Sequence, residues 1–168
     1  MKKLLLALFL IFSVLLFSAE RKIPVEQTFK DENSGKVYVQ GEKTPYTGIV
    51  EAKYSNGKVK ILVSYKNGKI EGIAKSYYPS GKLEGEQTYK NNIRDGISKE
   101  YYEDGKLKLE ALYKDGNRDG ITKSYYPNGK VQLEVNFKSG QLDGVLKKFD
   151  ENGKLINQET YQNGNKIN

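Results

Sequence analysis

The chain has 168 residues, of which 28 are Lys or Arg and 21 are Asp or Glu, so its formal net charge is +7. It contains no Cys, His or Trp. These absences exclude a Ser-His-Asp triad, a thiol nucleophile, an imidazole base and the usual zinc, haem and iron–sulfur sites. We therefore expect no catalytic residues, no metal ligands and no cofactor, and the sequence predicts a protein that is not an enzyme.

The first nineteen residues have the pattern of a secretory signal peptide. Lys2 and Lys3 form a basic start, 4–17 is apolar except for Ser13, and two small residues precede the polar Glu20. A short apolar run with these flanks is typical of a signal peptide and is shorter than a membrane span. We expect cleavage after Ala19 and export, with a periplasmic, envelope-associated or secreted location; the alternative is an uncleaved N-terminal anchor.

Residues 20–47 are predicted to be an N-terminal linker with a degenerate capping half-repeat. The stretch 20–32 is charged and lacks clear periodicity, whereas 34–37 repeats the Gly-Lys-Val pattern found further along the chain. One strand is expected around 36–40. Terminal units of a repeat array are commonly atypical because they cover an open end.

A repeat of 24 residues without insertions runs through 48–168. The glycine that opens each unit is numbered offset 0, so the units are 48–71, 72–95, 96–119, 120–143 and 144–168. Offset 1 is Ile or Val, offsets 9 and 10 are Gly-Lys, and offset 17 is Tyr or Phe in every unit. The structural glycines predicted from this pattern are Gly48, Gly72, Gly96, Gly120 and Gly144 at offset 0, and Gly57, Gly81, Gly105, Gly129 and Gly153 at offset 9.

Each unit is predicted to form a β-hairpin. Asn56-Gly57 and its equivalents lie between β-rich runs and favour two-residue type I′ turns, and a second turn signal such as Asn67-Gly68 joins one hairpin to the next. The predicted fold class is all-β: an elongated, twisted single-layer antiparallel meander of hairpin repeats.

The predicted turns also set the strand register. A two-residue turn at offsets 8 and 9 pairs positions whose offsets sum to 17. This register places Lys opposite Glu in the three central units, which favours cross-strand pairing. It also places each repeat glycine opposite an aromatic residue, whose ring is expected to cover the glycine.

The two faces of the predicted sheet differ in composition. The face with the repeat glycine, the small residues at offsets 2 and 4 and the aromatic residue at offset 17 is expected to be the packed side. The other face has Ile or Val at offset 1, Lys at offset 3, an aromatic residue at offset 5 and Glu at offset 14. On that face we predict partner-binding candidates, namely Tyr77, Tyr101, Tyr125, Phe149, Lys75, Lys99 and Lys123.

The repeat resembles a known family. The pattern Gly-Ile-x-Lys-x-Tyr-Tyr-x-x-Gly-Lys-Leu, followed by Tyr-Lys-x-Gly and Asp-Gly, is similar over 45–168 to the MORN-repeat variant of bacterial YwqK-like proteins. The resemblance implies a twisted sheet of hairpins that serves as a protein-interaction or membrane-associated scaffold. Many proteins of this group carry the label of toxin–antitoxin system antitoxins.

Two hypotheses for function follow. The first is a scaffold that binds a protein partner, because Tyr is effective at contact surfaces. The alternative is an envelope module that binds glycan or lipid head groups. We expect no nucleic-acid partner, because the predicted register sets Lys against Glu. The Gly-Lys dipeptides lack the spacing of a phosphate-binding loop.

Overall fold

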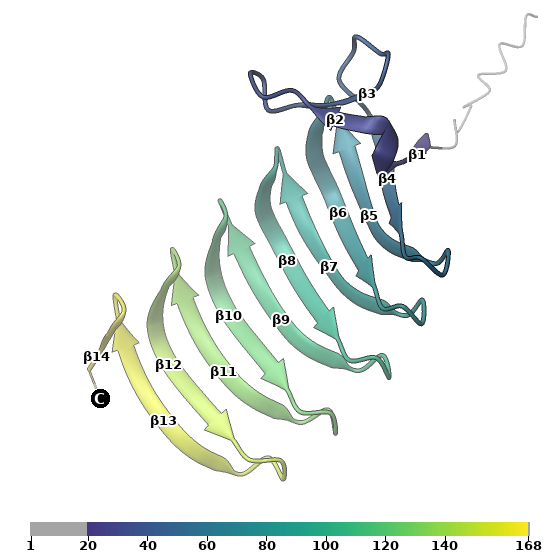
Figure 1. The fold of residues 1–168 in the computed structure, drawn as a ribbon. Helices are drawn as coiled ribbons and strands as arrows, with labels where there is room; N and C mark the ends of the chain where they lie inside the picture. Colours follow the sequence, from purple (N-terminus) through teal and green to yellow (C-terminus); the bar gives the residue numbers. More distant parts are fainter. Residues whose placement is uncertain (1–19, 168) are drawn as a thin grey trace, which may run out of the picture.

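The computed structural model describes residues 20–167, and the predicted signal peptide lies outside them. The described residues form a twelve-stranded sheet and a separate two-stranded sheet. The long sheet is a meander from β4 to β14, with β1 added in parallel beside β4, so the predicted all-β hairpin array is confirmed. Figure 1 shows the hairpins side by side in an elongated ribbon of curved strands.

The strands follow the repeat closely. The N-terminal elements are β1 (Lys22–Pro24), the 3₁₀ helix η1 (Val25–Gln27), β2 (Thr28–Lys30) and β3 (Val37–Val39). The array comprises β4 (Gly48–Lys53), β5 (Val59–Lys66), β6 (Lys69–Tyr77), β7 (Leu83–Lys90), β8 (Ile93–Tyr101), β9 (Leu107–Lys114), β10 (Asn117–Tyr125), β11 (Val131–Lys138), β12 (Gln141–Phe149), β13 (Leu155–Gln162) and β14 (Asn165–Lys166).

The turns differ from the prediction. At Asn67-Gly68 both residues have positive φ, 51° and 77°, so the type I′ turns are those that join one hairpin to the next. At Asn56-Gly57 only the glycine has positive φ, and the loop is closed by hydrogen bonds from the Gly57 N–H to the Tyr54 carbonyl (2.9 Å) and from the Tyr54 N–H to the Lys58 carbonyl (2.8 Å). This is a three-residue loop with a glycine bulge. The type I′ assignment at Gly57 and its equivalents is therefore wrong.

The predicted register is nevertheless confirmed. Each predicted pair is found: Lys75 with Glu86, Lys99 with Glu110, and Lys123 with Glu134. The loop is one residue longer than predicted, and a β-bulge compensates. In the first unit Ala52 pairs with Ile61 but Lys53 pairs with Val59, so Lys60 is the extra residue.

The repeat glycines lie where the ladder to the preceding unit is interrupted. On β6, Ile70 pairs with Tyr65 and Ala74 with Val63, leaving more residues on β6 than on β5 around Gly72. Gly72 has a φ of +90°, a conformation that side-chain-bearing residues rarely adopt. The glycine thus allows the local bend in the strand.

A side chain added at Gly96 would point away from the paired ring. Gly96 does pair with Tyr113. However, a Cβ built on Gly96 would meet the Cβ of Thr88 at 2.9 Å, and its three nearest neighbours are all Thr88 atoms. The positive φ turns the missing side chain away from the ring and toward the preceding unit. The glycine is required by the backbone and by Thr88 rather than by Tyr113.

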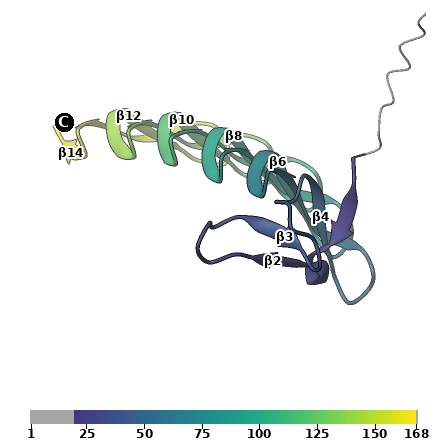
Figure 2. The same cartoon turned by 90° about the horizontal axis from the view of Figure 1, so that it is seen from above.

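The N-terminal segment is a folded cap, where the sequence analysis expects a linker over 20–32. β1, η1 and β2 occupy most of that stretch, while the strand expected around 36–40 is confirmed as β3. Ile23, Val39, Tyr46 and Val50 form a buried cluster. The Tyr46 hydroxyl donates to the Arg21 carbonyl at 2.6 Å. Figure 2 shows the β2–β3 hairpin against one face of the sheet at its N-terminal end.

The face predicted to be packed is the more buried one, and we call it the inner face. Ser98, Ala111, Thr122 and Val135 follow one another across β8 to β11 and are all buried. Their small or branched side chains form the floor of this face. The opposite side of the sheet, which we call the outer face, carries the exposed Ile side chains at offset 1.

Candidate functional site

The outer face carries a ladder of alternating charges. Lys99 lies between Glu86 and Glu110, and Lys123 lies between Glu110 and Glu134. Ion pairs join Lys99 Nζ to Glu110 Oε1 at 3.5 Å and Lys123 Nζ to Glu134 Oε2 at 3.0 Å. The Glu134 carboxylate raises the pKa of Lys123. Lys99 and Lys123 are therefore largely neutralised by neighbours, whereas the third candidate, Lys75, forms no ion pair of 4.0 Å or shorter within the described residues, and each exposed pair is worth only about 0.2–1 kcal/mol.

The aromatic partner-binding candidates lie beside this ladder on the outer face. We call Tyr77, Tyr101, Tyr125 and Phe149 the candidate aromatic column. Its four members are half-buried, and each accepts, at its backbone carbonyl, a hydrogen bond from a tyrosine of the preceding unit. These bonds run from Tyr54 to Tyr77 (2.7 Å), Tyr78 to Tyr101 (2.7 Å), Tyr102 to Tyr125 (2.6 Å) and Tyr126 to Phe149 (2.9 Å). The backbone of the column therefore connects neighbouring units.

Tyr101 has a second polar contact. Its hydroxyl donates to Glu86 Oε1 at 3.2 Å, and desolvation together with the Glu86 charge raises the pKa of Tyr101. The phenol is therefore protonated at neutral pH and acts as a donor. Its hydroxyl is the polar group of this side chain, and Glu86 accepts its proton in the hydrogen bond.

An apolar row on the same face is the feature that the sequence analysis did not single out. Ile97 is 49% exposed and Ile121 is 53% exposed, and Ile73 and Val145 continue the row. Ile97, Leu112 and Ile121 line a depression of about 340 Å³, which Glu110 and Lys123 border. The sequence signal for this row was the presence of Ile or Val at offset 1 of every unit, on a face whose other predicted residues are charged or aromatic. We call Ile73, Ile97, Ile121, Val145 and Leu112 the isoleucine row.

The Gly-Lys dipeptides connect neighbouring units at the turns. Lys58 Nζ donates to the Ser80 carbonyl (2.7 Å), Lys106 Nζ to the Pro127 carbonyl (2.7 Å) and Lys130 Nζ to the Asn152 carbonyl (2.8 Å). In these three units the Lys at offset 10 thus satisfies a backbone carbonyl of the next unit. Sequence reasoning assigned these residues no role, although their presence in every unit was a signal.

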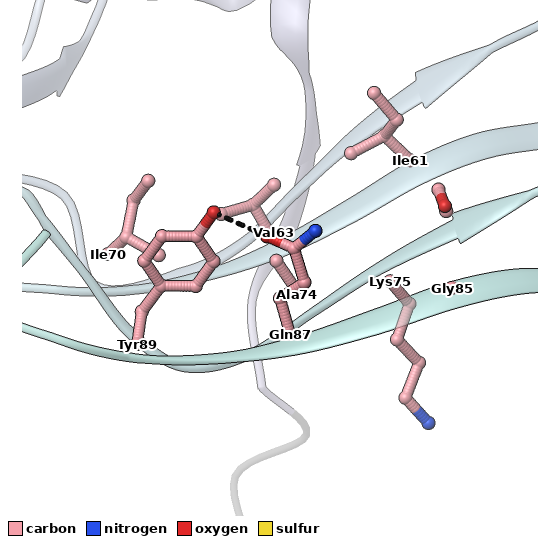
Figure 3. A pocket seen from close by; sticks show the side chains of 9 residues that line it. Ile61, Val63, Ile70, Ala74, Lys75, Gly85, Gln87 and Tyr89 are labelled. Carbon is pink, nitrogen blue, oxygen red and sulfur yellow. Dashed lines mark hydrogen bonds between the residues drawn. The ribbon is translucent and has the colours of Figure 1, made fainter. Parts of the chain in front are cut away.

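Figure 3 shows an irregular hollow on the inner face. Gly85 occupies offset 13, where the other central units have leucine, and the missing side chain leaves a depression of about 240 Å³. Ile61, Val63 and Ile70 supply its apolar wall, and the Tyr89 hydroxyl donates to Gln87 Oε1 at 2.9 Å.

Across 20–167, no group of three or more His, Cys, Asp or Glu residues is arranged to hold a metal ion. Within the same residues, no helix is long and apolar enough to cross a membrane.

The geometry defines a class: an elongated β-hairpin repeat protein with a single long sheet. The family model of the MORN repeat variant matches it at five segments, 46–67, 70–91, 94–115, 118–139 and 142–163. The chain therefore belongs to the MORN repeat variant family. Each matched segment begins two residues before a repeat glycine, so the period agrees with the sequence analysis.

The family also indicates the general kind of function. Its repeats are non-catalytic modules, commonly for interaction with proteins or membranes. A comparison with curated proteins found no match. The finer resemblance to YwqK-like antitoxins thus stays a prediction.

Proposed function

We propose that this protein is an exported, non-enzymatic scaffold that binds a partner protein through its outer face. The partner would be an envelope protein or a toxin that the scaffold neutralises. The observation that carries this proposal is the isoleucine row, in which large apolar side chains repeat along an exposed surface. Contiguous exposed apolar surface is a feature of interaction sites. The signal-peptide pattern of 1–19 supports export.

The composition of the outer face fits a protein interface. Such interfaces have an apolar centre and a polar rim, and aromatic residues are enriched in them. Here the isoleucine row lies on one side of the Lys–Glu ladder, and the candidate aromatic column, which includes Tyr101, lies on its other side. Because units advance by two strands, equivalent groups recur about every 9.6 Å, which suits a partner that contacts several units at once.

The alternative is an envelope module that binds glycan or lipid head groups. The aromatic column favours it, since rings can stack on sugars. Two observations favour a protein instead. The column is half-buried, and the lysines next to it are paired with glutamates, which weakens attraction to anionic head groups.

The test is a pair of variants that differ only in position. Ile97→Glu places a charge in the centre of the row, whereas Ile93→Glu introduces the same change at an equally exposed site near a turn. The wild type and both variants are used as bait with envelope extract, and are also tested on purified cell wall and on anionic liposomes. We expect the row variant to lose a protein that the wild type and the Ile93 variant retain.

Two results would contradict the proposal. One is equal capture by all three baits. The other is that no protein partner is captured, while the wild type binds to cell wall or liposomes and Tyr101→Ala abolishes this binding. That result would support the alternative.

A further inference from the structure

A second row of special composition lies on the inner face. Tyr89, Arg94, Tyr113, Arg118 and Phe137 alternate there, and we call them the arginine–aromatic row. The Cζ of Arg94 lies 5.3 Å from the centroid of the Tyr113 ring, and the Cζ of Arg118 lies 5.3 Å from that of Phe137. Each guanidinium Nε also points at the preceding ring's hydroxyl, Arg94 at Tyr89 (3.5 Å) and Arg118 at Tyr113 (3.3 Å). The rings therefore orient both guanidinium groups.

Among the described residues, neither of these arginines has a carboxylate partner. Within 20–167, no ion pair of 4.0 Å or shorter includes Arg94 or Arg118. Asp119 follows Arg118 directly in sequence, yet its carboxylate accepts the Ser139 N–H at 3.1 Å instead. Arg21, in contrast, donates to both carboxylate oxygens of Glu42, at 2.6 and 3.0 Å. Two oriented guanidinium groups thus keep free N–H donors, which suit bidentate recognition of carboxylates.

The fold itself does not require arginine at these positions. The equivalent residue in the first unit is Ile70, which pairs with Tyr65, and in the fourth unit it is Leu142, which pairs with Phe137. An aliphatic side chain therefore fills the same place between two rings. The positive charge at 94 and 118 is an addition to a row that packs without it.

The distance between the two arginines matches one backbone conformation of a peptide ligand better than another. Arg94 and Arg118 are one unit apart, which is two strands or about 9.6 Å. In a polyproline II segment every third side chain points the same way, after a rise of about 9.3 Å. Side chains on one side of a β-strand are instead about 6.8 Å apart. Aromatic-lined surfaces are also a common docking site for polyproline II segments.

We propose that the arginine–aromatic row binds an acidic polyproline II segment of a partner protein, with Asp or Glu residues three positions apart on Arg94 and Arg118. The residues between them would lie over the Tyr113 ring. This site is on the inner face, so it is separate from the isoleucine row and does not depend on it.

The test uses a fluorescein-labelled peptide of four Pro-Pro-Glu repeats. A control peptide has the same composition but places its glutamates next to one another. Binding to the wild-type protein is followed by fluorescence anisotropy at low and physiological salt. Two double variants are compared: Arg94→Gln with Arg118→Gln, and Lys90→Gln with Lys114→Gln. Lys90 and Lys114 are exposed and belong to the same units, so the second variant removes the same charge outside the row.

We expect the arginine variant to bind the repeat peptide at least about tenfold more weakly, the lysine variant to differ by less than about twofold, and the adjacent-glutamate peptide to bind poorly. Circular dichroism checks that both variants fold. If the glutamine variant does not, Arg94→Leu with Arg118→Leu replaces it, because Ile70 and Leu142 show that the row accepts aliphatic residues.

Several outcomes would overturn the proposal. Equal losses in the arginine and lysine variants would mean general attraction between charges. Equal affinity for the two peptides would mean that the spacing has no role. Absence of peptide binding together with arginine-dependent binding to phosphatidylglycerol vesicles would assign the row to lipid, and absence of both would leave it a packing feature.

Discussion

The repeat glycines allow the sharpest test of the fold, through a matched pair of alanine substitutions. Gly96 has a φ of +123°, and an added Cβ would lie 2.9 Å from Thr88 Cβ and 3.1 Å from Thr88 Cγ2. Gly72 has a φ of +90°, and its added Cβ would meet only Ser64 Cβ, at 3.9 Å. Gly96→Ala therefore combines backbone strain with a steric clash, whereas Gly72→Ala brings backbone strain alone.

The expected magnitudes follow from these two terms. A side-chain-bearing residue held in a sparsely populated backbone region costs about 1–3 kcal/mol. Overpacking against an immobile neighbour costs about 1–3 kcal/mol more. Thr88 cannot easily move, because its hydroxyl donates to the Ile97 carbonyl at 3.0 Å. We expect Gly72→Ala to lower the free energy of unfolding by about 1–3 kcal/mol and Gly96→Ala by about 2–6 kcal/mol.

Urea unfolding followed by circular dichroism, with all three proteins at the same temperature, measures both losses. Because units of an array are stabilised by their neighbours, the m-value must also be compared, since a lower m-value would show that the array no longer unfolds as one unit. Equal losses at the two sites would refute the role assigned to Thr88. Unchanged stability in both variants would refute the requirement for positive φ.

Three further predictions concern the Tyr102 hydroxyl, the Glu159 carboxylate and the N-terminal segment. Tyr102→Phe removes the donor to the Tyr125 carbonyl and should lower the free energy of unfolding, measured in urea, by about 0.5–1.5 kcal/mol. Tyr77→Phe should be nearly neutral, because the Tyr77 hydroxyl makes no hydrogen bond within 20–167. A larger loss for Tyr77→Phe than for Tyr102→Phe would contradict the inter-unit role of the offset 6 tyrosines. Hydrogen bonds from Lys166 and Tyr161 lower the pKa of Glu159 from 4.5 to about 2, so the stabilisation from this carboxylate is fully present above pH 4.5 and is lost as the pH falls toward 2. Thermal melts between pH 2 and 6 should therefore show a weaker pH dependence for Glu159→Gln, and identical profiles would disprove the shift. Mass spectrometry of the protein from its native host should find a mature chain that starts near Glu20, and an intact 1–19 segment on a cytoplasmic protein would refute export.

Much of the architecture could be read from the sequence because the repeat supplies several copies of the same evidence. An uninterrupted period and paired turn signals were sufficient to predict the meander. The opposition of Lys99 to Glu110, repeated in the neighbouring units, was sufficient to predict the register. Alternation of side chains along a strand then separated a packed face from a polar one, and the buried Ala111 and Ser98 confirm that separation. These features depend on local geometry, which a periodic sequence shows directly.

Other features depended on contacts between units. The loop at Gly57 and the bulge at Lys60 have opposite effects on register, so pairing alone could not reveal either of them. The direction of the missing Gly96 side chain follows from a φ value that the residue type permits but does not specify. The lysine at offset 10 and the arginines at 94 and 118 acquire roles only when the next unit brings a carbonyl or a ring beside them. Sequence therefore determined the strands, their order and their faces, because these follow from short-range periodicity, whereas tertiary structure decided which side chains are used between units and which stay free for a partner.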